Sequence, residues 1–184
     1  MAIEKPAYQV IKRVGTCELR SYAPNITATV EVDGKDYAQA ATHGFRPLAS
    51  YIFGENISTE EIAMTAPVTA QPKAESIAMT SPVTVTKGKG YRVSFFMPSK
   101  YTLETLPKPN NPQVQFTQNP AKKMACIRFS GGFNQRNFEK NLEKLHEWMQ
   151  KEGLKQSGEA VIAGYDPPFT PWFLKHNEIL IQVD

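Results

Sequence analysis

Cysteine and histidine are scarce in this chain of 184 residues, which has two cysteines and three histidines. Cys17 and Cys126 are far apart in the sequence, and each lies within a strand-like pattern. A disulfide scaffold needs a denser set of cysteines, so we expect two buried, reduced thiols. The histidines are scattered along the chain and do not form the clustered ligand set of a zinc site.

Long apolar runs are also absent. No segment approaches the roughly 20 apolar residues that a membrane-spanning helix needs. The first residues, Met-Ala-Ile-Glu-Lys-Pro-Ala-Tyr, have neither the basic start nor the apolar stretch of a signal peptide. These absences predict no membrane partner and a cytoplasmic location.

Acidic residues are rare in one part of the chain, although the net charge is only +3. Between Lys87 and Arg128 there are eight lysines or arginines and one acid, Glu104. Such a run can attract an anionic ligand, but nucleic-acid-binding domains show denser basic clusters. We therefore expect a solvated face and no nucleic-acid partner.

Common enzyme motifs are missing as well. The sequence has no glycine-rich phosphate loop, no Gly-x-Ser-x-Gly elbow and no Cys-x-x-Cys-His haem attachment site. Glu31, Glu61 and Glu159 remain free to converge in the fold, but their spacing does not indicate a catalytic pair. The expectation is a protein without enzymatic activity.

What is present indicates one domain over residues 1–184, a length that can bury a sizeable core. Period-two alternation and β-branched residues predict strands over residues 7–14, 17–22, 26–32, 91–98, 114–117, 124–129, 159–165 and 177–183. An apolar stripe at helical spacing predicts a helix over 36–53, and a second stripe predicts one over 134–151. Pro47 predicts a kink or a split of the first helix near His43.

The order strands, helix, strands occurs twice, so we expect an α+β fold with an antiparallel sheet and two similar βαβ-like halves. The segment Ile62–Thr69 (IAMTAPVT) also returns as Ile77–Thr84 (IAMTSPVT). The two copies start fifteen residues apart, and this period is too short for a stacking repeat unit. The repeat is therefore interpreted as a local duplication that lengthens one hairpin. Which copy lies in the core is left open.

Several segments together resemble the SOUL family, the haem-binding-protein family. They are GFRPLASYIFGEN, IAMTAPV, FFMPSKYTLETLPKPNNPQV, CIRFSG and AGYDPPFTPWF followed by NEILI. The resemblance runs from about Tyr8 to Val183. It implies a distorted antiparallel β-barrel with two helices. It also implies non-covalent tetrapyrrole binding, with haem as the cofactor, in a shallow groove between the first helix and the loop before the last strand.

The groove implied by this resemblance has candidate walls in both segments. They are Phe45, Leu48, Ala49 and Ile52 from the helix, and Tyr165, Phe169, Trp172 and Phe173 from the loop. Arg46 and Lys175 lie beside them and could meet the propionates of a haem. In the alternative interpretation, these aromatic residues only plug one end of the barrel.

The chain departs from the family pattern at the position of the iron ligand. An animal member of the family is thought to use a histidine where this chain has Ser21. His43, in the first helix, is the best candidate for the haem iron, and His176, in the loop before the last strand, is a second histidine that could approach the groove. Two other functions stay open: a general binding module for amphipathic or aromatic small molecules, and an enzyme that acts on such ligands.

Overall fold

A computed structural model describes residues 3–59, 74–166 and 169–184 of the chain. Most of the predicted elements are present within these ranges. In chain order they are β1 (Tyr8–Val14), β2 (Cys17–Tyr22), β3 (Asn25–Val32), α1 (Tyr37–Ile52), β4 (Asn56–Ile57), β5 (Val83–Lys87), β6 (Tyr91–Phe96), β7 (Lys108–Pro109), β8 (Gln115–Asn119), β9 (Lys122–Phe129), α2 (Gln135–Glu152), β10 (Val161–Gly164), the 3-10 turn η1 (Trp172–Leu174) and β11 (Asn177–Val183).

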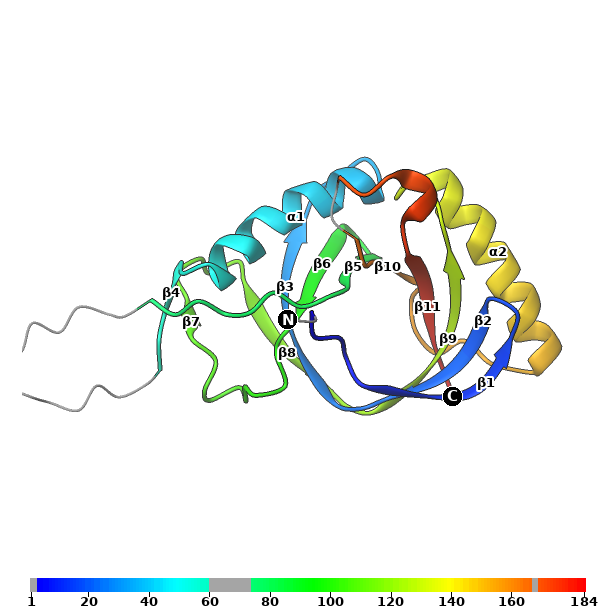
Figure 1. Ribbon diagram of the computed structural model, residues 1–184, viewed down its shortest axis with the longest axis horizontal. Coiled ribbons are helices and arrows are strands. Elements are labelled where there is room, and N and C mark those ends of the chain that lie inside the picture. Colours follow the sequence, from blue (N-terminus) through cyan, green and yellow to red (C-terminus); the bar gives the residue numbers. More distant parts are fainter. Residues whose placement is uncertain (1–2, 60–73, 167–168) are drawn as a thin grey trace, which may run out of the picture.

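Nine strands form one antiparallel sheet in the order β1-β2-β9-β11-β10-β5-β6-β3-β8 (Figure 1). The α+β class with a large antiparallel sheet and two α-helices is therefore confirmed. The closed barrel is not: among the described residues the ladder has two edges, β1 and β8. The short strands β4 and β7 pair separately.

The sheet order is symmetric about the β10–β5 pair. Strand β9 with β11 and β10 on one side matches β3 with β6 and β5 on the other. Strand β2 precedes β3 in the sequence but pairs with β9 of the other half. Strand β8 precedes β9 in the sequence but pairs with β3 of the other half. The two βαβ-like halves are therefore interlocked by an exchange of their first strands.

Two long arms give the sheet its curvature. Strand β2 runs almost directly into β3, and β8 into β9, with a break at Pro24 in one arm and at Pro120 in the other. Proline cannot donate to a ladder, so it belongs at such interruptions. In Figure 1 both arms sweep along the side of the molecule away from α1.

Helix α1 begins where the side chain of Asp36 accepts a hydrogen bond from the Gln39 N–H, and it continues through Pro47. The predicted split near His43 is therefore wrong. Gly44 lies where the helix crosses β6, and a Cβ at this position would lie 2.4 Å from the Val93 side chain. Only glycine lets the helix approach the sheet so closely.

Helix α2 follows the sequence prediction closely. Asn134 caps its first turn, and Gly153, in the left-handed region with φ 67°, ends it. Phe138, Leu145 and Met149 from the predicted apolar stripe are buried against the sheet.

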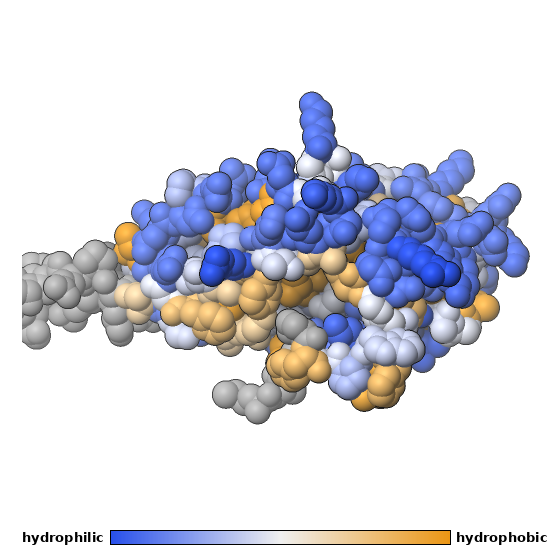
Figure 2. Space-filling view, turned by 90° about the horizontal axis from the view of Figure 1, so that it is seen from above, coloured by the Kyte–Doolittle hydropathy of each residue, from blue (hydrophilic) through white to orange (hydrophobic). Residues whose placement is uncertain are grey.

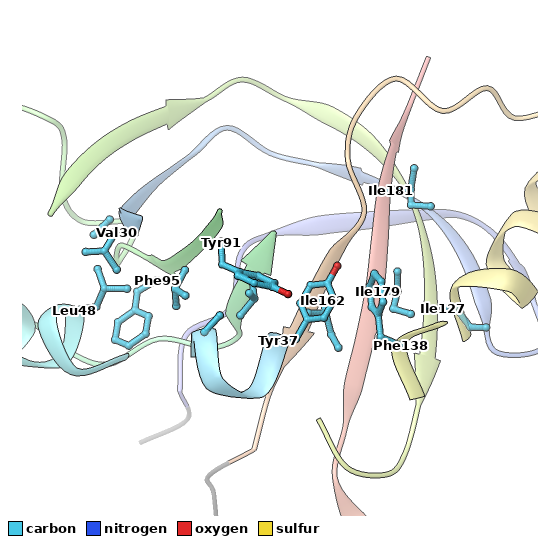
Figure 3. Close-up of a cluster of buried hydrophobic side chains, with 14 of the residues drawn as sticks. Val30, Tyr37, Leu48, Tyr91, Phe95, Ile127, Phe138, Ile162, Ile179 and Ile181 are labelled. Atoms are coloured by element: carbon cyan, nitrogen blue, oxygen red, sulfur yellow. The ribbon is translucent and has the colours of Figure 1, made fainter. Parts of the chain in front are cut away.

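The core lies between the two helices and one face of the sheet (Figure 3). Every second strand residue contributes, as Val30, Phe95 and Ile179 illustrate. The Tyr37 ring of α1 lies 4.4 Å from the Phe138 ring of α2, centroid to centroid, so one continuous core joins the two halves. Among the described residues, none of the helices combines the length and apolarity that crossing a membrane requires.

The second copy of the repeated segment lies in this core. Ile77 is 1% exposed, the Thr80 hydroxyl donates to the Phe96 carbonyl, and Val83 begins β5. The first copy, Ile62–Thr69, lies outside the described residues.

Candidate functional site

The outer surface of α1 carries part of the predicted groove. Phe45, Arg46 and Ala49 line a shallow hollow of about 460 Å³, together with Ser50, Phe53 and Glu55. Phe45 remains 38% exposed while its ring packs edge-on against Phe95, with centroids 5.4 Å apart. This hollow offers an apolar floor with one cation and one carboxylate at its margin.

Two of the predicted groove residues do not reach this surface. Leu48 and Ile52 are 0% and 1% exposed, and both belong to the main core. They lie on the face of α1 that packs on the sheet, because residues three and four apart share one side of a helix. The periodicity that identified the stripe therefore marked its buried side.

The loop before β11 exposes an unusual amount of apolar surface. Four apolar residues of this loop are more than half exposed: Phe169 at 86%, Trp172 at 69%, Phe173 at 58% and Leu174 at 64%. The Trp172 and Phe173 rings make an edge-on pair with centroids 5.7 Å apart. We call Phe169 and Trp172–Leu174 the aromatic loop.

The aromatic loop is anchored by its backbone. The Trp172 carbonyl accepts a hydrogen bond from the Gly131 N–H at 3.0 Å, and the Leu174 N–H donates to the Pro171 carbonyl. In Figure 1, η1 and α1 lie along the same rim of the molecule. Figure 2 looks onto this rim and shows exposed apolar groups gathered along one side of it. The two predicted segments therefore lie at the same rim of the molecule.

Tyr165, by contrast, contacts His176 and Glu178. Its ring stacks on His176 with centroids 4.2 Å apart, and its hydroxyl donates to Glu178 at 2.7 Å. It lines a cleft on the other face of the sheet, together with Tyr22. Tyr165 was predicted as a wall of the haem groove, and the structure places it in this separate environment.

A buried charge network lies beneath Tyr165. Arg20 donates from Nη1 and Nη2 to the two carboxylate oxygens of Glu178, at 2.7 and 2.8 Å, and from Nε to Glu18 at 2.6 Å. His176 Nε2 lies 2.9 Å from Glu178. Arg20 and Glu178 are 3% and 2% exposed, so this network is held in a low-dielectric environment.

The network controls the protonation of its members. Burial alone would raise the pKa of Glu178, but the hydrogen bonds from Arg20 and His176 outweigh it and lower the pKa to about 2. Burial similarly acts to lower the pKa of Arg20, and the hydrogen bonds to Glu178 raise it above its ordinary value. Both groups stay charged at neutral pH. Burial also raises the pKa of the Cys126 thiol, which favours an unreactive thiol.

Sequence reasoning did not identify this network. A signal was present, because Glu18, Arg20 and Glu178 alternate in their strands with apolar core residues. Alternation assigned them to the far face, which is normally solvated. The fold instead covers that face with Tyr8, whose ring lies 4.3 Å from the Arg20 guanidinium.

The far face of the sheet forms a cleft of about 890 Å³. Most strands contribute side chains that alternate with core residues, such as Thr27, Thr84 and Ser94. One end of the cleft is apolar and includes Tyr22, Met124 and Leu180. The cleft and the aromatic loop are thus two separate candidate sites.

The predicted cations and the predicted iron ligand lie at the surface. Arg46 is exposed and Lys175 is half-buried. His43 is exposed on α1, and its Nδ1 lies 3.0 Å from the Asp33 carbonyl, which leaves Nε2 directed away from that contact. Within the described ranges, no three His, Cys, Asp or Glu side chains are grouped so that they could hold a metal ion.

The chain is similar to proteins of known name over nearly its whole length. It is 30% identical to the mouse (Mus musculus) protein "Heme-binding protein 2", with 98% of this chain and 90% of that protein covered. The human (Homo sapiens) "Heme-binding protein 2" is also 30% identical, with coverage of 96% and 88%.

A likeness to a solved structure supports the fold alone. The C-terminal domain of EcmrR superposes with a TM-score of 0.63 at 14% identity, covering 96% of this chain and 98% of that one. The family model described as SOUL heme-binding protein matches residues 3–182. Because this match takes in both helices and every strand of the large sheet up to β11, the chain belongs to the SOUL heme-binding protein family.

Proposed function

We propose that this protein binds haem or a related tetrapyrrole reversibly, as a non-enzymatic carrier, buffer or sensor. The observation that carries the proposal is the aromatic loop, in which Trp172 and Phe173 are exposed although their backbone is anchored. Contiguous exposed apolar surface of this kind usually marks a binding site in a soluble protein. Membership of the SOUL family favours a tetrapyrrole as its ligand.

The aromatic loop and the α1 hollow suit a flat apolar ligand. The rings of Phe45 and Trp172 offer faces and edges against which a macrocycle can pack. Burial of apolar area contributes about 25 cal/mol per Å², as an upper estimate. Micromolar affinity requires about 8 kcal/mol, which apolar contact of a porphyrin face can supply without a bond to iron.

Polar groups at the margin fit the rest of a haem. The side chains of Arg46 and Lys175 make no hydrogen bond or ion pair with another described residue, so each is available to a propionate. His43 is held through Nδ1 by the Asp33 carbonyl, the arrangement that orients a metal-binding histidine toward its ligand position. When bound, haem would supply a light-absorbing, redox-active iron centre, while these residues would orient it.

A general binding module for amphipathic or aromatic molecules is the second candidate function. The observation that favours it is that the exposed surface consists of aromatic and aliphatic side chains, which do not distinguish iron porphyrins from other flat ligands. Metal-free protoporphyrin therefore serves as the discriminating ligand.

The test is a titration of the purified protein with haemin and with metal-free protoporphyrin, followed by absorbance and by Trp fluorescence. We expect both to bind in the micromolar range, and Trp172→Ala to weaken both about tenfold. Leu103→Ala is the matched control, because Leu103 is an exposed apolar residue outside the aromatic loop. Failure of both ligands to bind the wild-type protein would overturn the proposal.

A further inference from the structure

The cleft on the far face of the sheet contains a cation that has no partner among the described residues. Lys122, at the start of β9, is half-buried and lines the cleft, yet it makes no ion pair or side-chain hydrogen bond with the described part of the chain. Burial lowers its pKa, and no neighbouring charge contributes. A buried ammonium without a counter-charge is unfavourable, so an anion at this position would be stabilised.

Polar groups next to Lys122 favour the same kind of ligand. The Asn119 amide donates to Asn25 and to the Thr27 hydroxyl oxygen, at 3.0 and 3.2 Å. Because Thr27 Oγ1 accepts this bond, its own O–H remains available to donate into the cleft. The Lys122 ammonium and the Thr27 hydroxyl are thus two donors in one stretch of the wall. Neither is paired with a carboxylate of the described residues.

The adjacent wall is apolar. Strand alternation puts Met124 on the same face as Lys122, and Tyr22 lies opposite Lys122 in the β2–β9 register. Leu180 and Val161 extend this surface. A ligand with an anionic head on Lys122 could therefore lay an apolar body along the wall.

Charged groups elsewhere in the cleft do not neutralise Lys122. Glu159 is paired with Arg92 at 3.1 Å, and Glu31 is the register partner of Arg92 on the neighbouring strand. The Arg20–Glu178 network below Tyr165 is internally paired. Lys122 therefore remains the cation without a described counter-charge in this wall.

We infer that this cleft is a second ligand site, which binds a small amphipathic organic anion with its carboxylate on Lys122 and its apolar body against Tyr22, Met124 and Leu180. The site goes beyond the proposed tetrapyrrole site, because it lies on the opposite face of the sheet from α1 and is formed by different residues. Its volume of about 890 Å³ is ample for a ligand with one or two aromatic rings.

The first test uses 1-naphthaleneacetate and its uncharged analogue 1-naphthaleneacetamide on the wild-type protein. A ¹H–¹⁵N NMR titration should show saturable shifts of residues in β2, β3, β8 and β9, with the carboxylate binding about tenfold more tightly than the amide. Equal affinities, or shifts confined to α1 and the aromatic loop, would overturn the inference. This measurement does not depend on the folding of any variant.

The second test compares Lys122→Gln with Lys123→Gln, its exposed neighbour on the same strand. We expect Lys122→Gln to remove the preference for the carboxylate over the amide, whereas Lys123→Gln retains it. Saturation with 1-naphthaleneacetate should leave haemin affinity unchanged. Competition between the two ligands would show a shared site and overturn the inference. If the wild-type protein binds 1-naphthaleneacetate but does not bind haemin, that result would count against the tetrapyrrole proposal only.

Discussion

Arg20 and Glu178 face each other in two parallel hydrogen bonds, Nη1 to Oε2 at 2.7 Å and Nη2 to Oε1 at 2.8 Å, although 158 positions separate them in the sequence. Arg20 lies on β2 and Glu178 on β11, and β9 runs between these strands. The pair therefore spans β9 and ties the first half of the chain to the last strand. This geometry is the strong, bidentate form of an arginine–carboxylate contact.

Loss of one partner should be costly, because it leaves the other buried charge uncompensated. We expect Glu178→Gln to lower the free energy of unfolding by about 3–5 kcal/mol. Urea denaturation of the variant measures this effect. Glu159→Gln, which breaks the exposed pair with Arg92, is the control and should cost less than about 1 kcal/mol. Similar losses in the two variants would contradict the structural role assigned to the Arg20–Glu178 pair.

Stability should also fall in acid through Glu178. Its pKa is lowered from an ordinary 4.5 to about 2 in the folded protein, so its stabilising effect is complete above about pH 4.5. The effect is then lost as the pH falls from about 4.5 to 2, and it amounts to about 3 kcal/mol at neutral pH. Denaturation across this pH range should show that the free energies of unfolding of the wild type and of Glu178→Gln converge toward pH 2. A constant difference between them would exclude Glu178 as the titrating group.

A charge on the α1 hollow should weaken tetrapyrrole binding. Phe45→Asp puts a carboxylate where an apolar ligand face would rest, and we expect affinity for protoporphyrin to fall about tenfold or more. Thermal unfolding shows whether the variant is folded, since Phe45 also touches Phe95. If Phe45→Asp unfolds, Phe45→Ser keeps the test open. Unchanged affinity in a folded variant would exclude α1 from the site.

Iron ligation should contribute little to affinity. Apolar contact dominates the proposed site, so we expect His43→Ala to change haemin affinity by less than about threefold and to leave the haem absorption band in place. Metal-free protoporphyrin is the control ligand. If His43→Ala greatly weakens the affinity for haemin but not for protoporphyrin, and shifts the haem absorption band, His43 would be identified as the axial ligand.

The repeated segment provides its own matched pair of variants. Ile77 in the second copy is 1% exposed, so Ile77→Ala should reduce stability by about 2–5 kcal/mol. Ile62 occupies the same position in the first copy. If the first copy is only an insertion, Ile62→Ala will leave the free energy of unfolding within about 0.5 kcal/mol of wild type. Equal losses would show that both copies contribute to the core.

Local sequence patterns predicted the helices and strands well, because the start and end of each element depend on residues that are close in the sequence. Helix α2, bracketed by Asn134 and Gly153, lies close to the predicted range 134–151, and a turn at Gly15 with φ 59° joins β1 to β2. The exchange of β2 and β8 between halves depends on pairing between distant segments. Such long-range pairing leaves little trace in local periodicity.

The candidate site was predictable to a smaller extent. The aromatic loop stands out by composition, and the structure exposes Trp172 and Phe173. Leu48 was assigned to the groove because the family resemblance puts the first helix beside the ligand, and the apolar stripe of that helix does not say whether it faces the core or a ligand. Lys122 resembles any surface lysine until the curved sheet partly encloses it.

The exchange of first strands bears on how such a chain could arise. A peptide of one half alone would hold an incomplete sheet and a protruding strand with no neighbour. Two identical copies could complete each other by trading these strands, as in a domain-swapped dimer. The present chain has the arrangement that fusion of such a dimer into one polypeptide would produce, with the swapped partner supplied in cis.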